Sequence, residues 1–440
     1  MTDRLRIIGG VPLHGSVTVG GSKNATLPIM AAAILADEPV VLDNVPNLSD
    51  VTTLGEVLAV LGLDVDRSDN GRMRLATLNP LPTTAPYRLV RRMRASFCVL
   101  GPLLARRGSA RVALPGGCNL GHRPVDLHLR GLAALGADIR IDRGYVIAQA
   151  ARLRGARINL LGPRGPTVTG TANVLCAATL ARGTTIIENA AREPEIVDLA
   201  DFLMNLGARI EGAGAPTIAV RGVDQLGGTN HRIIPDRIEA ATLLLAGAIT
   251  RGCVCVQGVE PQHLTAVLDG LATAGAELEI AGNHVTIRTS RALTATSVTA
   301  QPYPGFPSDV QSQWMALAAV SASNCVIRDE VFPHRWSHVA EMERLGARIH
   351  LQGDTATVQG NSRLHGCSVT ASDLRASAAL VLAALAAEGT TTIRGVHHLD
   401  RGYSGLQNKL AAIGARIERI QTRLALAHSH ERLAIMPEGL

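Results

Sequence analysis

The chain has 440 residues, which is long for a single hydrophobic core and favours two domains. Apolar residues make up 46% of it and charged residues 18%, as in an ordinary globular protein, while aromatic residues are only 2%. The net charge of +6 is spread along the chain, and few aromatic rings could stack on bases, so the composition argues against nucleic-acid binding.

The cysteines and the N-terminus indicate which kinds of protein this chain could be. The 7 cysteines are an odd number and none forms a CxxC pair, so we expect neither a disulfide framework nor a metal site. No signal-peptide region is visible, and no apolar run reaches the roughly 18 residues that a membrane span needs. We therefore expect a cytoplasmic protein without membrane insertion.

The first predicted helix covers residues 24–36, NATLPIMAAAILA. Two glycines, Ser22 and Lys23 precede it. Lys23 and Asn24 at a helix start indicate an anion site, because free N–H groups and a positive partial charge lie there. Lys23 could instead be an ordinary solvated lysine.

Residues 114–129, LPGGCNLGHRPVDLHL, form a glycine-rich loop that carries Cys118. Cys98 and Cys176 lie in apolar runs, as structural cysteines do, whereas Cys118 lies among glycines with Arg123 five residues later. Glycines let a loop fold closely over a ligand, and a nearby cation makes a thiol more reactive. Spacing alone leaves two alternatives open, a catalytic or redox cysteine and an exposed turn cysteine.

Residues 198–207, DLADFLMNLG, predict an amphipathic helix. Leu199, Phe202, Leu203 and Leu206 fall on one face of it. We expect Gly207 to end the helix in a left-handed conformation and a strand to follow.

The phrase around Gly207 occurs six times, about 70 residues apart, which is a genuine internal repeat. Its glycines are Gly62, Gly136, Gly207, Gly275, Gly346 and Gly414. Each copy follows an Ala/Leu-rich helix and a strand, so each unit reads as strands packed against helices. Such a unit cannot bury its apolar face alone, and we predict an α/β protein with three units in each of two domains. An open solenoid is disfavoured, because this unit is longer and richer in strands than solenoid repeats.

Polar residues gather in the strand-to-helix connection of every repeat. If these connections lie at equivalent ends of the repeats, facing domains would bring Cys118, Arg123, Arg335 and Arg401 toward one cleft.

Seven motifs then occur in a recognisable order. They are GGSKNATLP (20–28), PGGCNLGHRPVDLHL (115–129), ENAAREPEIVDLADFLMNLGA (188–208), PDRIEAAT (235–242), PGFPSDVQSQ (304–313), SDLRASAALVLAAL (372–385) and HLDRGY (398–403). Together, from about residue 5 to 420, they closely resemble the UDP-N-acetylglucosamine 1-carboxyvinyltransferases, enolpyruvyl transferases that start peptidoglycan precursor synthesis.

The resemblance implies a fold of two inverse α/β-prism domains, each with threefold internal pseudo-symmetry, in agreement with the six repeats. It also implies a domain division that repeat spacing does not give. Residues 22–233 would form one domain with the cysteine loop, and residues 1–21 and 234–440 the other, with 421–440 as an extra tail.

The family reaction transfers enolpyruvyl from phosphoenolpyruvate to the 3-hydroxyl of the sugar, releases phosphate, and uses no metal or organic cofactor. C3 of the enol gains a proton while the alcohol adds at C2, and the tetrahedral ketal then eliminates phosphate. This chemistry needs an acid over C3, a base near the hydroxyl, and cations around the donor's charges.

By resemblance, Cys118 is the acid, Asp309 is the base, and Lys23, Arg123 and Arg401 hold the donor's phosphoryl and carboxylate groups. Other residues complete the cleft: Asn24, Arg94, Asp373, Arg375 and Arg335, the last of which helps closure. The segment Arg123, Pro124, Val125, Asp126 and Leu127, together with Val331, would contact the UDP-sugar.

Three of these residues also have ordinary structural interpretations. Asp309 could cap a helix that starts near Val310. Asp373 and Arg375 could form a surface pair of little energetic value.

The stretch 165–175, GPTVTGTANVL, departs from the family pattern. Family members usually carry Ser-Val-Gly-Ala-Thr there, on a strand that contacts the nucleotide, where this chain has Pro166, Thr167 and Val168 and then Gly170. The departure motivates an alternative in the same class, a paralogue that acts on another nucleotide or UDP-sugar in secondary metabolism. A non-catalytic anion-binding protein is a third possibility, disfavoured because all the expected polar residues are present.

Overall fold

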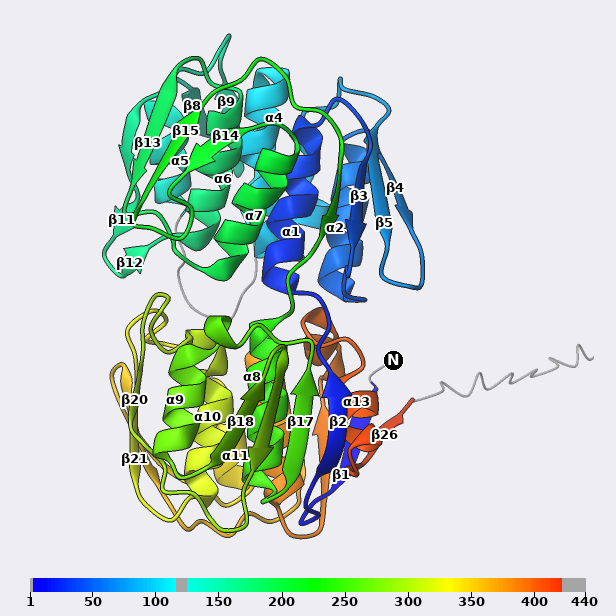
Figure 1. Cartoon of the computed structure of the whole chain (residues 1–440), viewed down its shortest axis with the longest axis vertical. Coiled ribbons are helices and arrows are strands. Elements are labelled where there is room, and N and C mark those ends of the chain that lie inside the picture. The colour runs from blue at the N-terminus through cyan, green and yellow to red at the C-terminus, as the bar shows by residue number, and fades with distance from the viewer. Residues whose placement is uncertain (1–2, 116–124, 422–440) are drawn as a thin grey trace, which may run out of the picture.

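The computed structural model describes residues 3–115 and 125–421, and the structural statements below concern these residues. They pack around two separate hydrophobic cores, one above the other in Figure 1. The first core is made by buried side chains between Ala25 and Ile233. The second core combines Leu5–Val19 with buried residues between Ile238 and Ala415.

Three four-stranded sheets and one hairpin belong to the first core. In each large sheet one outer strand is parallel to its neighbour and the other pairings are antiparallel. In spatial order the sheets are β16 (Thr229–Arg232), β3 (Val40–Asp43), β5 (Met73–Thr77), β4 (Leu63–Arg67); β6 (Thr84–Ala85), β7 (Ser109–Ala113), β9 (Tyr145–Gln149), β8 (Asp138–Asp142); and β10 (Arg157–Asn159), β13 (Thr184–Glu188), β15 (Thr217–Arg221), β14 (Arg209–Glu211). The hairpin pairs β11 (Leu161–Gly162) with β12 (Gly165–Pro166).

The second core has three four-stranded sheets with the same pairing pattern. They are β2 (His14–Thr18), β17 (Cys253–Gln257), β19 (His284–Arg288), β18 (Glu277–Ala281); β20 (Val298–Ala300), β21 (Cys325–Asp329), β23 (Thr355–Gln359), β22 (Arg348–Gln352); and β24 (Ser368–Thr370), β25 (Thr390–Arg394), β1 (Arg4–Ile8), β26 (Arg416–Ile420). Strands such as β1 alternate exposed and buried residues, so each sheet has a core face and an outer face.

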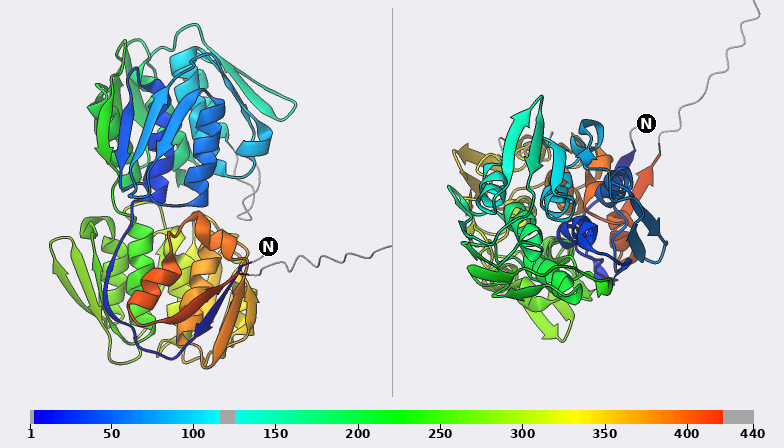
Figure 2. Two further views of the ribbon diagram at one scale, coloured as in Figure 1. Left: turned by 90° about the vertical axis from the view of Figure 1, so that its right-hand side faces the viewer. Right: turned by 90° about the horizontal axis from the view of Figure 1, so that it is seen from above.

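Helices fill the space inside the sheets (Figures 1 and 2). Those of the first core are α1 (Lys23–Ala32), η1 (Ala33–Leu35), α2 (Ser49–Val60), α3 (Tyr87–Val90), η2 (Arg94–Val99), α4 (Leu100–Arg107), α5 (Asp126–Ala134), α6 (Val168–Thr179) and α7 (Pro194–Asn205). Those of the second core are α8 (Arg237–Ile249), η3 (Pro261–His263), α9 (Thr265–Thr273), α10 (Ser308–Val320), α11 (Val339–Arg344), α12 (Leu374–Ala386), η4 (Val396–Arg401) and α13 (Leu406–Ala412). The predicted α/β class is confirmed.

Helices α8, α10 and α12 pack on one another at the centre of the second core and are almost fully buried. Alanine and leucine occur on every side of α8 and α12, as expected for helices without a solvent face. These helices therefore hold their N-terminal residues in fixed places.

The six repeat glycines lie where a helix gives way to a strand, and all have positive φ, between 86° and 108°. Side chains other than glycine rarely adopt this conformation. The helix end predicted at Gly207 is confirmed, and the other five glycines repeat it.

The chain passes between the two cores twice, after β2 and after β16, and the two crossing segments pair with each other. Gly21 and Pro235 form an antiparallel bridge, and the amide of Ser22 donates a 2.7 Å hydrogen bond to the carbonyl of Ile234. Adding a Cβ to Gly21 would place it 1.7 Å from the carbonyl oxygen of Asn44. Only glycine fits at this crossing.

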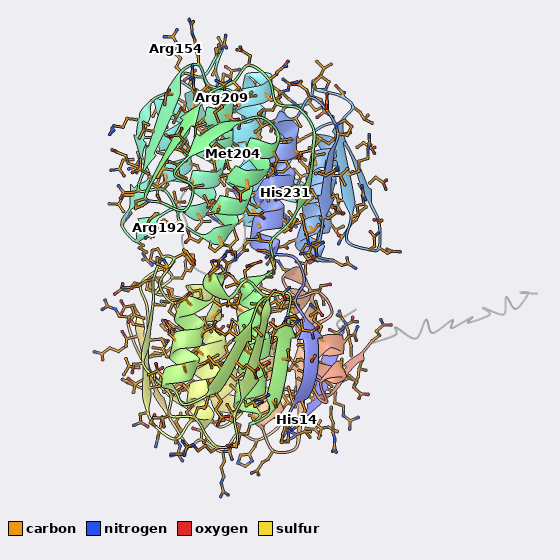
Figure 3. The ribbon with its side chains drawn as sticks, in the orientation of Figure 1. His14, Arg154, Arg192, Met204, Arg209 and His231 are labelled. Carbon is orange, nitrogen blue, oxygen red and sulfur yellow. The ribbon has the colours of Figure 1, made fainter. Side chains whose placement is uncertain are left out.

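A buried histidine–carboxylate pair anchors the second crossing segment. His231 of β16, labelled in Figure 3, packs beside α7, and its Nε2 lies 2.9 Å from Oδ1 of Asp198. The other oxygen of Asp198 accepts a hydrogen bond from the amide of Ile234. This network fixes the segment just before it reaches the second core.

No helix in the described ranges is both long and apolar enough to cross a membrane.

Candidate active site

The N-terminal ends of several helices face one another between the two cores. The amide of Lys23, the first residue of α1, donates a 3.1 Å hydrogen bond to Asp236, which caps α8 in the second core. Asn24 of α1 donates to Asp309 in the first turn of α10. Helix N-termini carry positive partial charge, so their convergence favours an anionic ligand between the cores.

The side chain of Lys23 is buried between the two cores and is not solvated. Ser22 caps α1 with a hydrogen bond from the amide of Ala25, and this cap fixes where the helix begins. The Lys23 residue is only 8% exposed, and its Nζ lies 2.8 Å from Oδ2 of Asp50. Burial lowers the pKa of Lys23, an effect that the carboxylate of Asp50 opposes. The interpretation as a solvated lysine is wrong.

Asp50 was not predicted from the sequence, although it joins the two cores. It lies in the first turn of α2 and is 3% exposed. Its Oδ1 accepts a 2.9 Å hydrogen bond from Nε of Arg401, in η4 of the second core. Burial alone would raise the pKa of Asp50, but Lys23 and Arg401 outweigh it and the pKa is lowered. The polar connection NVPNL ahead of α2 was the available signal.

Arg401 is supported by its neighbour in η4. Both carboxylate oxygens of Asp400 accept 2.7 Å hydrogen bonds from Arg419 of β26. Ser49 of the first core donates to the carbonyl of Asp400 at 3.4 Å. These bonds hold the turn that presents Arg401 to Asp50.

Asp309 lies between two arginines. Its Oδ1 is 2.8 Å from Nη1 of Arg335, and its Oδ2 is 2.8 Å from Nη2 of Arg375. Burial acts in the opposite direction, but these two cations hold the pKa of Asp309 well below its ordinary value. Because Pro307 precedes α10 and no side chain caps it, the N-cap interpretation of Asp309 is wrong.

Arg375 is fully enclosed within the second core. Its Nη1 donates a 3.1 Å hydrogen bond to the hydroxyl of Tyr403, which also contacts Thr242 and Gln313. Although burial acts to lower it, Asp309 raises the pKa of Arg375. Arg375 is therefore a permanent cation.

Asp373 serves the helix on which Arg375 lies. Its Oδ1 accepts hydrogen bonds from the amides of Arg375 and Ala376, and so caps α12. Its Oδ2 accepts a 2.6 Å hydrogen bond from Ser337. With Asp373 8% and Arg375 2% exposed, the surface-pair interpretation is wrong.

Arg335 reaches Asp309 from the connection after β21. Besides the ion pair, its Nη1 donates to the hydroxyl of Ser308, which in turn donates to Asp329. Asp329 also accepts a 3.0 Å hydrogen bond from the amide of Val331, the predicted contact of the UDP-sugar. The buried carboxylate of Asp329 thus holds the connection after β21 in place through its hydrogen bonds.

A second buried ion pair between the cores was also missed. Arg237 of α8 makes two hydrogen bonds to Glu195 of α7, of 2.9 and 3.2 Å, and its guanidinium lies over the ring of Tyr303. The pair lies in two of the recognised motifs, 188–208 and 235–242, but no periodicity could have shown that they meet.

The stretch expected to be a nucleotide-contacting strand is mostly helical. Thr167 caps α6 through the amide of Gly170, and Val168 is the first residue of the helix. The strand expectation is wrong beyond Pro166, where β12 ends. In front of α6, the β11–β12 hairpin comes so close to the second core that a Cβ on Gly165 would lie 2.8 Å from Cγ of Pro302.

The other predicted residues of this side lie at helix starts. Arg94 begins η2 and is partly buried, and Val125, Asp126 and Leu127 form the start of α5. Cys118, Arg123, Pro124 and residues 422–440 of the predicted tail lie outside the described residues.

Comparisons with known proteins agree with these features. A family model described as EPSP synthase (3-phosphoshikimate 1-carboxyvinyltransferase) matches residues 7–410. A UDP-N-acetylglucosamine 1-carboxyvinyltransferase from Xanthobacter autotrophicus is 51% identical over 431 residues, covering 95% of this chain and 99% of the relative. One from Geotalea uraniireducens is 50% identical, covering 95% of this chain and 100% of the relative.

Two solved structures are similar as well. The enolpyruvyl transferase NikO from Streptomyces tendae has a TM-score of 0.86 and 28% sequence identity, covering 96% of this chain and 100% of the other. An EPSP synthase from Acinetobacter baumannii has a TM-score of 0.72 at 18% identity, covering 95% and 100%, and shows similarity of fold alone.

Proposed function

This chain belongs to the UDP-N-acetylglucosamine 1-carboxyvinyltransferase family of transferases, as its motifs predicted, and from that premise we propose that it transfers enolpyruvyl from phosphoenolpyruvate to the 3-hydroxyl of UDP-N-acetylglucosamine. Phosphate is released, and the product enters peptidoglycan synthesis. The observation that carries the proposal is the meeting of Lys23, Arg335, Arg375 and Arg401 between the two cores, in a chain half identical to these enzymes.

The charges of this region suit a doubly anionic donor. Lys23 and Arg401 approach each other around Asp50, and a phosphoryl or carboxylate group could bind the same cations. Preorganised cations stabilise charge that develops on the phosphate as it leaves, because they need not reorient during the reaction.

Asp309 is assigned to the acceptor. Its low pKa keeps it ionised at neutral pH, so it can accept a hydrogen bond from the 3-hydroxyl and orient that group toward C2 of the donor. The proton at C3 is assigned to the Cys118 thiol. As the 3-hydroxyl oxygen bonds to C2, its proton passes to Asp309. Elimination then returns the proton on C3 to the Cys118 thiolate and expels phosphate, and the enol ether remains on the sugar.

We also infer two inverse α/β-prism domains, residues 22–233 and residues 1–21 with 234–440. Two separate cores with three sheets of one pairing pattern each support this division.

Phosphate release by the purified full-length chain tests the proposal. With phosphoenolpyruvate present, UDP-N-acetylglucosamine should support rapid release, and the chain without an acceptor should release none. A panel with UMP and other UDP-sugars covers the alternative of a paralogue with another acceptor, which the departure at 165–175 motivates. If none of these acceptors supports phosphate release, both the proposed function and the alternative of a paralogue would be contradicted.

A further inference from the structure

Asp50 contacts two cations that come from different cores, whereas an ordinary ion pair joins one anion to one cation. A single carboxylate in the first core contacts one cation of its own core, Lys23, and one of the other core, Arg401. Oδ2 lies 2.8 Å from the lysine Nζ and accepts from the arginine Nη2 at 3.4 Å, while Oδ1 accepts from Nε at 2.9 Å. Both cations are those assigned to the donor.

Because Lys23 and Asp50 are both buried, the charge of Asp50 affects the protonation of Lys23. The Lys23 side chain is 10% exposed and that of Asp50 4%. A buried ammonium group without a partner tends to lose its proton, since burial disfavours the charged form. Arg401 adds a second positive charge, which also disfavours protonation of Lys23.

The charged groups around Lys23 come from four elements. Asp50 of α2 is the carboxylate in contact with Nζ, while Arg401 of η4 and Arg375 of α12 both act to lower the pKa of Lys23. Asp236, ahead of α8, is engaged with the backbone amide of Lys23 and with the start of α8. Asp50 is therefore the group that opposes the effect of burial on the side chain.

We propose that Asp50 is a positioning residue that keeps Lys23 ionised and holds it together with Arg401 across the two cores until the donor anion binds. The inference rests on the proposed function, because it takes these two cations as the donor's partners. Asp50 also occupies part of their hydrogen-bonding capacity, so the donor's anionic group must compete with its carboxylate. Asp50 should thus support anion binding at high pH and oppose it at low pH.

The binding of inorganic phosphate to the full-length chain, measured by titration calorimetry at pH 6 and pH 9, tests this sign change. In Asp50→Asn the competing charge is gone, so phosphate should bind at least as tightly as to the wild type at pH 6. At pH 9 a larger fraction of Lys23 should have lost its proton in the variant than in the wild type, and binding should be weaker by about tenfold or more. Asp50→Glu restores the charge and should restore much of the binding at pH 9.

The pH profile of phosphate release provides the second measurement. The alkaline limb of kcat/KM for phosphoenolpyruvate should move to lower pH in Asp50→Asn. Asp64→Asn, which removes an exposed carboxylate paired with Arg74, is the matched control and should leave the limb in place. A wild type that binds phosphate but catalyses no transfer would refute the proposed function and leave the phosphate titration as the test of Asp50.

An equal loss of phosphate affinity at both pH values in Asp50→Asn would overturn the proposal. Should Asp50→Asn fail to fold, Asp50→Glu remains informative, because the added methylene keeps the charge but shifts the carboxylate relative to Lys23 and Arg401. Its phosphate affinity at pH 9 should fall below that of the wild type by less than tenfold, and an equal loss at pH 6 and pH 9 would contradict the inference.

Discussion

Asp309 and Arg375 form an ion pair of 2.8 Å within the second core, and Arg335 completes it from the other side of the carboxylate. Asn24, from the first core, reaches the same carboxylate at 3.4 Å. One acidic side chain is thus in contact with both cores, and it is the residue that the family resemblance predicts as the base. A mutation of Asp309 therefore tests its predicted role as the base directly.

Replacing Asp309 with asparagine should lower the turnover of phosphate release by roughly a hundredfold or more, because the amide cannot accept the proton of the hydroxyl. The fold should survive, since the amide oxygen can still accept one of the arginine hydrogen bonds. Asp354→Asn, which removes one of the two carboxylates paired with the half-exposed Arg328, is the control and should change neither turnover nor melting temperature appreciably. Unchanged turnover in Asp309→Asn would remove Asp309 from the reaction.

The crossing segments allow a test of the fold with two neighbouring glycines. A Cβ at residue 21 would lie 1.7 Å from the carbonyl oxygen of Asn44, whereas one at residue 20 would lie 3.5 Å from the carboxylate of Glu239. Gly21→Ala should therefore destabilise the protein by about 3 kcal/mol, because backbone must shift to relieve the clash. Gly20→Ala should cost much less. Equal urea-unfolding midpoints for the two variants would contradict the described crossing.

His128 should make stability depend on pH. His128 is 2% exposed; its Nδ1 contacts Nδ2 of the buried Asn173 at 2.8 Å, and its Nε2 contacts the hydroxyl of the partly buried Thr169 at 3.2 Å. Burial lowers the pKa of His128 to about 3, with Arg94 adding to the effect. The unfolded chain therefore binds a proton below about pH 6.5 that the folded chain does not.

The resulting stability loss should be roughly 1.4 kcal/mol per pH unit as the pH falls from about 6.5 toward 4. The variant His128→Gln lacks this titration, so its free energy of unfolding should fall less steeply than that of the wild type. Urea unfolding at pH 7, 6 and 5 measures both slopes, with the exposed His14→Gln as control. Parallel slopes for wild type and His128→Gln would show that His128 does not titrate as its burial requires.

The sequence carried the local structure well, because that structure depends on periodic patterns. Gly207, predicted to end a helix, has positive φ, as do the other five repeat glycines. Leu199, Phe202, Leu203 and the C-cap residue Leu206 are buried as expected. The residues that cap or begin a helix were harder to predict from the sequence. Thr167 follows a short strand and precedes a long helix, and the family motif alone placed it on a strand.

Contacts between the cores could not be predicted from patterns. Asp50 and Arg401 are 351 positions apart in the chain, and they meet only because both crossing segments bring α2 opposite η4. Glu195 and Arg237 are closer in sequence, but their pairing likewise depends on how α7 and α8 face each other. The predicted residues Lys23, Asn24, Asp309 and Arg375 do meet here, whereas their roles in catalysis stay predictions.

The chemistry assigned to Cys118 gives the last prediction. A proton donor to carbon must be protonated at rest yet acidic enough to release its proton, and a thiol with a pKa near 8.5 meets the first condition at neutral pH. A nearby cation such as Arg123 would make the thiol more acidic. Cys118→Ser should lose activity, because a hydroxyl is far too weak an acid. Cys118→Asp should keep measurable activity with its pH optimum moved downward, because a carboxyl group is protonated only at lower pH.

The same assignment predicts which thiol reacts first with a small phosphonate epoxide when the acceptor is present. Burial raises the pKa of Cys98 and of Cys325 to about 12 and raises that of Cys176 as well, so these three thiols should stay protonated and unreactive. Peptide mapping after brief exposure should find the label on Cys118, with Cys367, a partly exposed thiol whose pKa burial also raises, as the internal comparison. Labelling of another cysteine first, or full activity in Cys118→Ser, would show that the proton comes from elsewhere.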